Sequence, residues 1–445
     1  MKMDPRPTHR TPPARVHEVL KKKLLVDGFD FVFDPARSDG PWLVDARDGS
    51  RWLDLFSFFA SAPLGYNHPG MRDQEFRARL LEAALVKPTC SDVYSEAQAD
   101  FVDTFSRILP AGFEHLFFIE GGALAVENAL KVAFDWKIQK NRRAGRGEGL
   151  GQSIVHFKSA FHGRSGYTLS LTNTADPRKY RDFPKFDWPR IVNPGLTFPL
   201  TQESVTATAA LETESLAALD FAIKTRGHDL AAIILESIQG EGGDVHFRPE
   251  FLRELRRRAD DHEMLLIFDE VQCGMGLTGR WWAFEHSGVS PDLFSFGKKS
   301  QVCGIAATTR CDDVDSVFKI ASRINSTWGG NLVDMVRCER YIEIIEKEGL
   351  LNAAARTGAA ALQRLHEIAE RHPRVTNVRG KGLMIAFDLP DTAERDTLRK
   401  LLLEDKTIIL SCGDRSLRFR PALDFPMEAV DIAMQRIDNA LRRLA

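Results

Sequence analysis

The sequence predicts an α/β fold, with a mostly parallel central sheet in a large domain and a smaller α+β domain after it. Two apolar runs, Met264–Phe268 and Leu293–Phe296, each lead directly into polar or glycine residues. Unbroken apolar runs of this length are typical of parallel strands that are buried on both faces. From residue 336 onward the pattern changes to long amphipathic stretches separated by short strands, which predicts a second domain of mixed composition.

The chain of 445 residues is long enough to contain both domains. We assign residues 1–65 to an N-terminal arm and part of the small domain, residues 66–335 to the large domain, and residues 336–445 to the C-terminal small domain. Prolines at positions 5, 7, 12 and 13 predict that the first 15 residues form a flexible arm.

Charge and hydropathy exclude several classes of function. The net charge is −2 and the sequence contains no basic stripe, so no nucleic-acid partner is expected. No apolar run approaches the roughly 20 residues that a membrane-spanning helix requires, and the N-terminus lacks the apolar core of a secretory signal. The six cysteines have no CxxC spacing, so we expect free thiols, a cytoplasmic protein and no metal site.

Two short β-like runs are expected near the N-terminus, first Phe29–Phe33 and then Pro41–Leu55, which has the pattern of a hairpin that turns at Asp48 and Gly49. Further on, a strand over His115–Ile119, a Gly121–Gly122 turn and a helix from Ala123 are predicted in succession. The unpaired amides at the start of such a helix can bind an anion. A turn with no ligand is the alternative, because most glycine pairs serve only as turns.

A lysine pair follows the apolar strand Leu293–Phe296. Burial lowers the pKa of an amine, so a lysine delivered into the interior can act as a nucleophile and form a Schiff base. A surface turn with two solvated lysines is the alternative. The other apolar strand leads into Asp269, and carboxyl ends of parallel strands are where such sheets place their ligands. A buried lysine and a buried acid together suit pyridoxal phosphate, which needs an amine for its aldehyde and an acid beside its ring nitrogen.

With this cofactor, Gly122 and Ala123 become the expected phosphate site. Farther along, Arg164 follows an apolar strand and the residues Phe161-His162-Gly163. We interpret Arg164 as a carboxylate clamp, with a salt-bridged scaffold arginine as the alternative. His162 is interpreted as a structural histidine whose hydrogen bonds are satisfied. The region from Ala175 to Thr225 shows no regular pattern.

The segment Ile267–Lys298, IFDEVQCGMGLTGRWWAFEHSGVSPDLFSFGK, resembles the class III aminotransferases, which are pyridoxal-phosphate enzymes of fold type I. The resemblance extends over nearly the whole chain from residue 20 onward. It implies that Lys298, which directly follows Gly297, binds the cofactor and that Asp269 holds the ring nitrogen protonated. The large domain is then the cofactor-binding domain.

Other residues take roles only through this resemblance. It implies that Phe161 stacks on the pyridine ring and that Gln272 lies beside the ring hydroxyl and the substrate, with an ordinary loop hydrogen bond as the alternative for Gln272. Asn325 is implied as a substrate contact, and Thr327 as a residue that reaches the cofactor phosphate of a neighbouring subunit. A homodimer with shared active sites follows, although Thr327 is also compatible with a local turn or helix cap.

The resemblance also implies a switch between two charged residues. Arg418, in the segment LRFRP, matches the family arginine that binds the α-carboxylate of 2-oxoglutarate. Glu241, in IQGEGGD, matches the glutamate that pairs with this arginine reversibly. Glu241 is therefore expected to act in both catalysis and substrate binding.

Within the family, four segments are most similar to the L-lysine 6-aminotransferase group, namely residues 161–173, 183–190, 238–244 and 296–304. This implies transfer of the ε-amino group of L-lysine to 2-oxoglutarate, giving L-glutamate and 2-aminoadipate 6-semialdehyde, which cyclises to piperideine-6-carboxylate. Arg164 is expected to anchor the distant carboxylate of lysine. The alternatives are an aminotransferase for ornithine, 4-aminobutyrate or another ω-amino acid or diamine, and a catalytically silent relative with the same fold.

Overall fold

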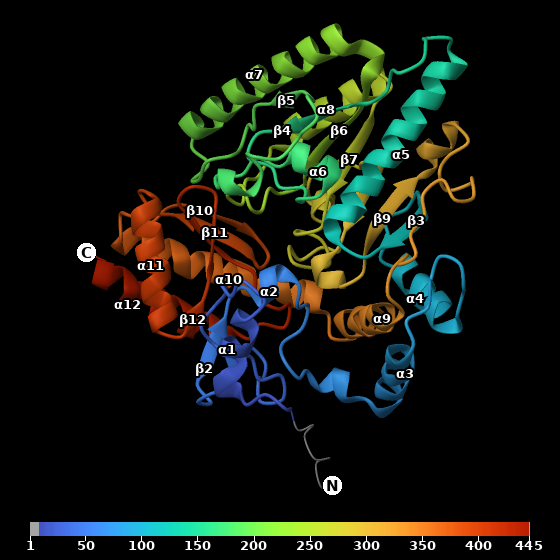
Figure 1. Ribbon diagram of the computed structural model, residues 1–445. Helices are drawn as coiled ribbons and strands as arrows, with labels where there is room; N and C mark the ends of the chain where they lie inside the picture. The colour runs from blue at the N-terminus through green and yellow to red at the C-terminus, as the bar shows by residue number, and fades with distance from the viewer. Residues whose placement is uncertain (1–8, 445) are drawn as a thin grey trace.

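A computed structural model describes residues 9–444 of the chain (Figure 1). The expected flexible arm falls in part on residues 1–8, which lie outside the described residues. The end of that arm was predicted wrongly, because Pro13–Arg15 forms a 3-10 turn that continues into helix α1 (Val16–Lys21). Pro13 favours this start, since a proline in the first helical position loses no intrahelical hydrogen bond.

A seven-stranded sheet forms the centre of the fold, in the order β3-β9-β8-β7-β6-β4-β5. Its strands are β3 (Phe113–Ile119), β4 (Ser153–Phe157), β5 (Arg190–Ile191), β6 (Leu230–Glu236), β7 (Leu265–Asp269), β8 (Leu293–Phe296) and β9 (Cys303–Thr308). The pairings from β5 through β8 are parallel, and β9 is antiparallel to both of its neighbours. The prediction of a mostly parallel central sheet is confirmed.

The two apolar runs are adjacent strands near the middle of this sheet. Every residue of β7 and β8 is buried, as expected for strands covered on both faces. The parallel register places Glu236, Asp269 and Ser295 side by side on β6, β7 and β8. The sheet thus brings two carboxylates together at the carboxyl ends of its central strands, next to the turn that carries Lys298.

Helices cover both faces of the sheet (Figure 1). Helix α5 (Gly122–Arg143) packs with apolar residues of one face, and α7 (Gln202–Arg226) and α8 (Pro249–Asp261) pack with those of the other. The strand–glycine–helix succession is confirmed, with α5 starting one residue earlier than predicted. The long helix α7 lies in the region for which no pattern was found. Its buried positions include Thr208, Glu212 and Ser215, so it has no continuous apolar stripe.

Two smaller sheets accompany the central one, and the first of them joins strands from the two ends of the chain. The predicted hairpin is confirmed as β1 (Trp42–Val44) and β2 (Arg51–Asp54), and β12 (Thr407–Ile408) pairs in parallel with β2. A four-stranded sheet has the order β10-β11-β14-β13. Its strands are β10 (Thr376–Lys381), β11 (Met384–Asp388), β13 (Leu410–Cys412) and β14 (Ser416–Phe419). The division of the chain at residues 65 and 335 stays a prediction.

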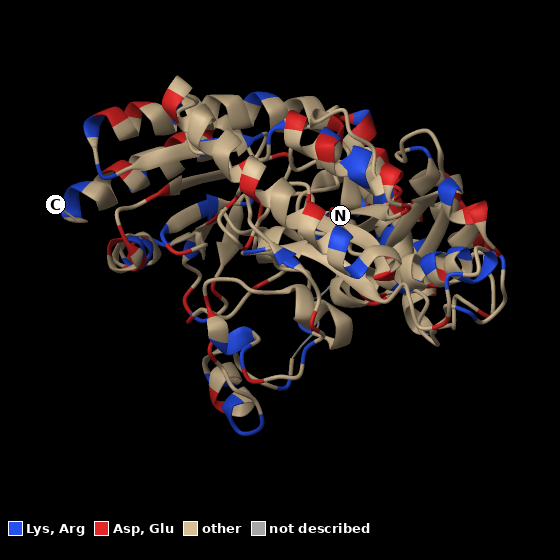
Figure 2. Cartoon of the chain, turned by 90° about the horizontal axis from the view of Figure 1, so that it is seen from above, with Lys and Arg blue, Asp and Glu red and all other residues tan. Residues whose placement is uncertain are grey.

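The remaining helices pack around these sheets. They are α2 (Ser57–Ala60), α3 (Gln74–Leu85), α4 (Glu96–Ser106), α6 (Gly166–Leu171), α9 (Leu332–Lys347), α10 (Leu350–Arg371), α11 (Thr392–Glu404) and α12 (Met427–Leu444). Among residues 9–444, no helix combines the length and apolar content needed to cross a bilayer. Basic and acidic residues are interspersed over the helices (Figure 2).

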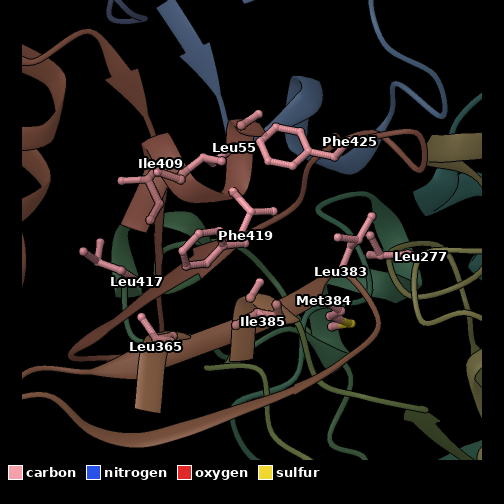
Figure 3. Packing of buried hydrophobic residues seen from close by; sticks show 14 of the residues in the cluster. Leu55, Leu277, Leu365, Leu383, Met384, Ile385, Ile409, Leu417, Phe419 and Phe425 are labelled. Atoms are coloured by element: carbon pink, nitrogen blue, oxygen red, sulfur yellow. The ribbon is translucent and has the colours of Figure 1, made fainter. Parts of the chain in front are cut away.

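An apolar cluster holds the C-terminal sheet against the N-terminal segment (Figure 3). Leu55, which follows β2, lies beside Phe425 and Phe419 in this cluster. Leu417 and Phe419 of β14 contribute to it, and side chains alternate along a strand. Arg418, between them, therefore points to the other face of the sheet, toward the loop that follows β6.

Candidate active site

A cavity of about 410 Å³ lies at the carboxyl ends of β6, β7 and β8. Seven of the predicted site residues line it, namely Gly122, Ala123, Phe161, Arg164, Asp269, Gln272 and Lys298. They come from four separate stretches of sequence, which the sheet and the start of α5 bring together. Four further predicted residues do not line this cavity: Glu241, Asn325, Thr327 and Arg418.

Lys298 reaches the cavity from the turn after β8. Its backbone is left-handed, with φ at +49°, a conformation that costs a non-glycine residue free energy. Burial, together with the nearby guanidinium groups of Arg418 and Arg420, lowers the pKa of its amine to about 8. A substantial fraction of the amine is therefore neutral near physiological pH, as a nucleophile requires.

Lys299 is also buried, but it lies outside the cavity. Its Nζ donates hydrogen bonds to the carbonyl oxygens of Ala62 (2.9 Å) and Pro421 (3.1 Å). The alternative of two solvated lysines is therefore wrong. Lys299 joins the N-terminal and C-terminal segments behind the turn that carries Lys298, and burial lowers the pKa of its amine to about 7.

This lowered pKa predicts a pH-dependent contribution to stability. Between pH 7 and 10.5 the unfolded chain binds more protons at Lys299 than the folded chain, so this residue makes the unfolding free energy rise with pH. The Lys299→Met variant is expected to lack that rise. Calorimetry at pH 7 and 9 should show that the Tm of the wild type increases relative to that of Lys299→Met. If the Tm of the wild type minus that of Lys299→Met stayed constant or decreased from pH 7 to pH 9, the assignment would be contradicted. Lys22→Met, at an exposed side chain, is the control.

Asp269 forms a buried hydrogen-bonded group with His162 and Ser295. Its Oδ2 lies 2.8 Å from His162 Nδ1, and its Oδ1 accepts hydrogen bonds from Ser295 Oγ (2.9 Å) and from the amide of Val271 (3.1 Å). These three contacts fix the orientation of the carboxylate in the cavity wall. The interpretation of His162 as a satisfied histidine is wrong, because its Nε2 has no hydrogen-bond partner among the described residues and it lines the cavity.

Glu236 is a residue of the site that the sequence did not reveal. It ends β6 and lines the cavity beside Asp269. Burial raises the pKa of its carboxyl to about 7, and the charge of Asp269 acts in the same direction while His162 opposes it. Its oxygens accept hydrogen bonds from the amides of Phe161 and Gly240, each at 2.9 Å, so it joins two loops of the cavity wall. Its position at the end of a fully apolar strand was the available signal.

The start of α5 forms another wall. No side chain caps this helix, so its first amides are available for an anion. Gly163 packs closely here: a Cβ atom on it would lie 2.5 Å from Ala123 Cβ, and its φ of +123° also favours glycine. The loop that carries Phe161 thus approaches the helix start.

The two predicted arginines differ in their charge environment. Arg418 is buried, and its guanidinium donates to Glu241 Oε2 (2.8 Å) and to Gln272 Oε1 (3.1 Å). Arg164 is exposed at the cavity and forms no ion pair within residues 9–444. The hydrogen bond of Gln272 agrees with the alternative proposed for it, although Gln272 also lines the cavity.

Asn325 and Thr327 lie on an exposed loop away from Lys298. Asn325 Oδ1 accepts a hydrogen bond from the amide of Ser326, and Thr327 is exposed. A single chain therefore does not bring these two residues to the cavity.

The cavity fits pyridoxal phosphate. A buried amine with a lowered pKa, an uncapped helix start, a buried carboxylate and the aromatic ring of Phe161 surround one space. These are the groups that the aldehyde, the phosphate, the ring nitrogen and the ring face of this cofactor require.

Comparisons with known proteins agree with this geometry. The family described as "Aminotransferase class-III" matches residues 27–441. The chain is 53% identical to the L-lysine-epsilon aminotransferase of Mycobacterium tuberculosis, over 97% of this chain and 96% of that protein. It is 49% identical to the protein of the same name from Amycolatopsis lactamdurans, with the same shares of the two chains. A solved structure of lysine aminotransferase from M. tuberculosis superposes with a TM-score of 0.96 at 52% identity, covering 98% of this chain and all of that one.

Proposed function

Because the chain belongs to the class III aminotransferases, which depend on pyridoxal phosphate, we propose that it transfers the ε-amino group of L-lysine to 2-oxoglutarate. The products are L-glutamate and 2-aminoadipate 6-semialdehyde, which cyclises to piperideine-6-carboxylate. The observation that carries the proposal is the contrast between its two arginines. Arg418 is neutralised by Glu241, whereas Arg164, at the cavity, forms no ion pair with any of residues 9–444.

This contrast suits the carboxylates of the two substrates. L-Lysine has one carboxylate, far from the reacting amine, which Arg164 can bind while Arg418 stays paired. 2-Oxoglutarate has two carboxylates, one of them next to the reacting ketone. Arg418 can bind that group once Glu241 has moved away, and Arg164 can bind the other. A single site therefore accommodates both substrates by breaking and restoring one ion pair.

The chain's own groups supply the remaining chemistry. When bound, pyridoxal phosphate supplies an electron sink for the carbon that carries the amine. Lys298 Nζ holds the cofactor and moves a proton at the reacting carbon. Asp269 holds a proton on the ring nitrogen, and His162 and Ser295 hold its carboxylate in place. The first turn of α5, at Gly122 and Ala123, holds the phosphate.

We propose a homodimer, because the exposed Asn325 and Thr327 can contribute to a cofactor site only in a neighbouring copy. We also propose a cytoplasmic location, with the six cysteines as free thiols.

Isotope transfer tests the proposed substrate and position directly. Incubation with 2-oxoglutarate and L-lysine labelled with ¹⁵N at the ε position should give ¹⁵N-glutamate, whereas the α-labelled isomer should not. Label transfer from the α position would refute the proposal. Faster turnover with ornithine or 4-aminobutyrate than with lysine would instead favour the related ω-amino-acid activities.

The two arginines should affect the half-reactions differently. Arg418→Ala is expected to leave conversion by lysine largely intact and to slow the return of the amine to 2-oxoglutarate. Arg164→Ala is expected to weaken both, since both substrates use it. Loss of a buried charged contact costs about 2–5 kcal/mol. Stopped-flow spectra of each half-reaction measure these effects, and equal damage to both halves by Arg418→Ala would exclude the switch.

A further inference from the structure

Glu241 is shared between two cations. Its Oε2 accepts a hydrogen bond from Arg418 Nη2 at 2.8 Å, and its Oε1 accepts one from Lys179 Nζ at 2.6 Å. Burial raises the pKa of this carboxyl, but Arg418 and Lys179 more than offset that effect, so the pKa lies below its ordinary value. Glu241 is therefore charged and is held from two sides.

The two cations occupy different surroundings. Arg418 is on a strand, buried, and also donates to Gln272. Lys179 ends the short turn Pro177–Lys179, and its side chain is 28% exposed. Lys179 belongs to the region from Ala175 to Thr225, in which no regular sequence pattern was found.

Glu241 also has room to move away from Arg418. It lines, together with Lys179, a separate cavity of about 450 Å³ that does not include Lys298. The backbone carbonyl of Glu241 is held by the amide of Gly413 at 2.8 Å. Rotation of the side chain can therefore carry Glu241 away from Arg418 and into this cavity while Lys179, which already contacts it, remains its partner.

Release of Arg418 from Glu241 would be unfavourable if it left the Glu241 carboxylate without a counter-ion. A carboxylate with 22% exposure is partly desolvated, so leaving it without a counter-ion costs free energy. We propose that Lys179 is the residue that retains Glu241 when Arg418 binds the α-carboxylate of the amino acceptor. Lys179 is thus a positioning residue, which acts through Glu241 and makes dicarboxylate binding more favourable. The inference rests on the proposed function, because it assigns a part of the same switch.

Three variants test it in the holoenzyme. Lys179→Met removes the ammonium, Lys179→Arg retains a positive charge, and Arg178→Met removes a positive charge from the same turn. Arg178 pairs with Asp176 and not with Glu241, so it is the matched control. In Lys179→Met, the KM for 2-oxoglutarate should rise about tenfold while the KM for lysine changes little. Lys179→Arg should restore most of the loss, and Arg178→Met should resemble the wild type.

Binding of glutarate provides a readout that is independent of turnover. Glutarate carries the two carboxylates of 2-oxoglutarate but no reacting ketone. Titration calorimetry of the holoenzyme should show about tenfold weaker glutarate binding in Lys179→Met. In a Glu241→Gln background the same substitution should have no effect, because no carboxylate remains to be retained.

Several results would overturn the inference. An effect of Lys179→Met that persists in the Glu241→Gln background would mean that Lys179 binds the dicarboxylate itself. Equal loss for lysine and 2-oxoglutarate, or an equal effect of Arg178→Met, would point to a structural or general electrostatic role. These outcomes differ from failure of the proposed function, in which the wild type itself would not transfer the ε-amino group of lysine.

Discussion

Replacing Lys298 with alanine is expected to abolish turnover and covalent attachment of the cofactor together. Lys298 is the lysine that lines the cavity, and burial lowers the pKa of its amine to about 8. Alanine removes both the nucleophile and the group that moves the proton. The loss should therefore exceed the roughly 10²–10⁴-fold that proton transfer alone contributes.

Borohydride reduction followed by mass spectrometry separates Lys298 from its neighbour. The wild type should show the mass of the cofactor on the peptide that contains Lys298, and Lys298→Ala should show no adduct. Lys299→Met is the matched control, since Lys299 is buried but directed at the carbonyl oxygens of Ala62 and Pro421. Retention of the adduct in Lys298→Ala and its loss in Lys299→Met would reverse the assignment.

The core of the site followed from local sequence patterns because the sheet geometry is regular. The two apolar runs predicted two buried parallel strands, which are β7 and β8. Adjacent parallel strands have their carboxyl ends at the same end of the sheet. Asp269, the last residue of β7, and Lys298, the second residue after β8, were therefore predicted to lie close together. The glycine pair before α5 was recognisable for the same reason, since a strand, a turn and a helix follow in immediate succession.

Contacts between distant segments were not predictable in this way. His162 follows a strand and a loop, and nothing in the neighbouring sequence indicates that its ring meets Asp269, 107 positions away. Lys179 lies in an irregular stretch and meets Glu241 only in the folded chain. Glu236 received no role from the sequence, although its burial at the end of β6 raises the pKa of its carboxyl. Partners of this kind depend on tertiary packing, which short sequence patterns do not encode.

Helix α7 was not predicted from the sequence for a different reason. Its 25 residues lie along the sheet, yet the positions that face inward include a threonine, a glutamate and a serine. Glu212 is buried because Arg248 pairs with it. Hydrophobic periodicity detects a helix only when its buried face is apolar, so this element produced no signal.

Asp269→Asn is expected to retain the cofactor but to lose about 10²–10⁴-fold in kcat, as for removal of a proton-holding or electrostatic group. Asparagine preserves the shape of the side chain, and its Oδ1 can still accept the hydrogen bonds of Ser295 and of the Val271 amide, whereas its amide nitrogen faces His162 Nδ1 as a donor. It lacks the negative charge that holds a proton on the ring nitrogen.

The charge can be distinguished from the hydrogen bonds by a second variant. Ser295→Ala removes one donor to Asp269 Oδ1 but leaves the carboxylate in place. A typical hydrogen bond contributes about 0.5–1.5 kcal/mol, so this control should lose no more than about tenfold in kcat. Absorbance spectra establish cofactor content in both variants, and steady-state assays give kcat. Near-normal turnover in Asp269→Asn, or an equal loss in Ser295→Ala, would contradict the role of the Asp269 charge, because the first variant removes that charge and the second does not.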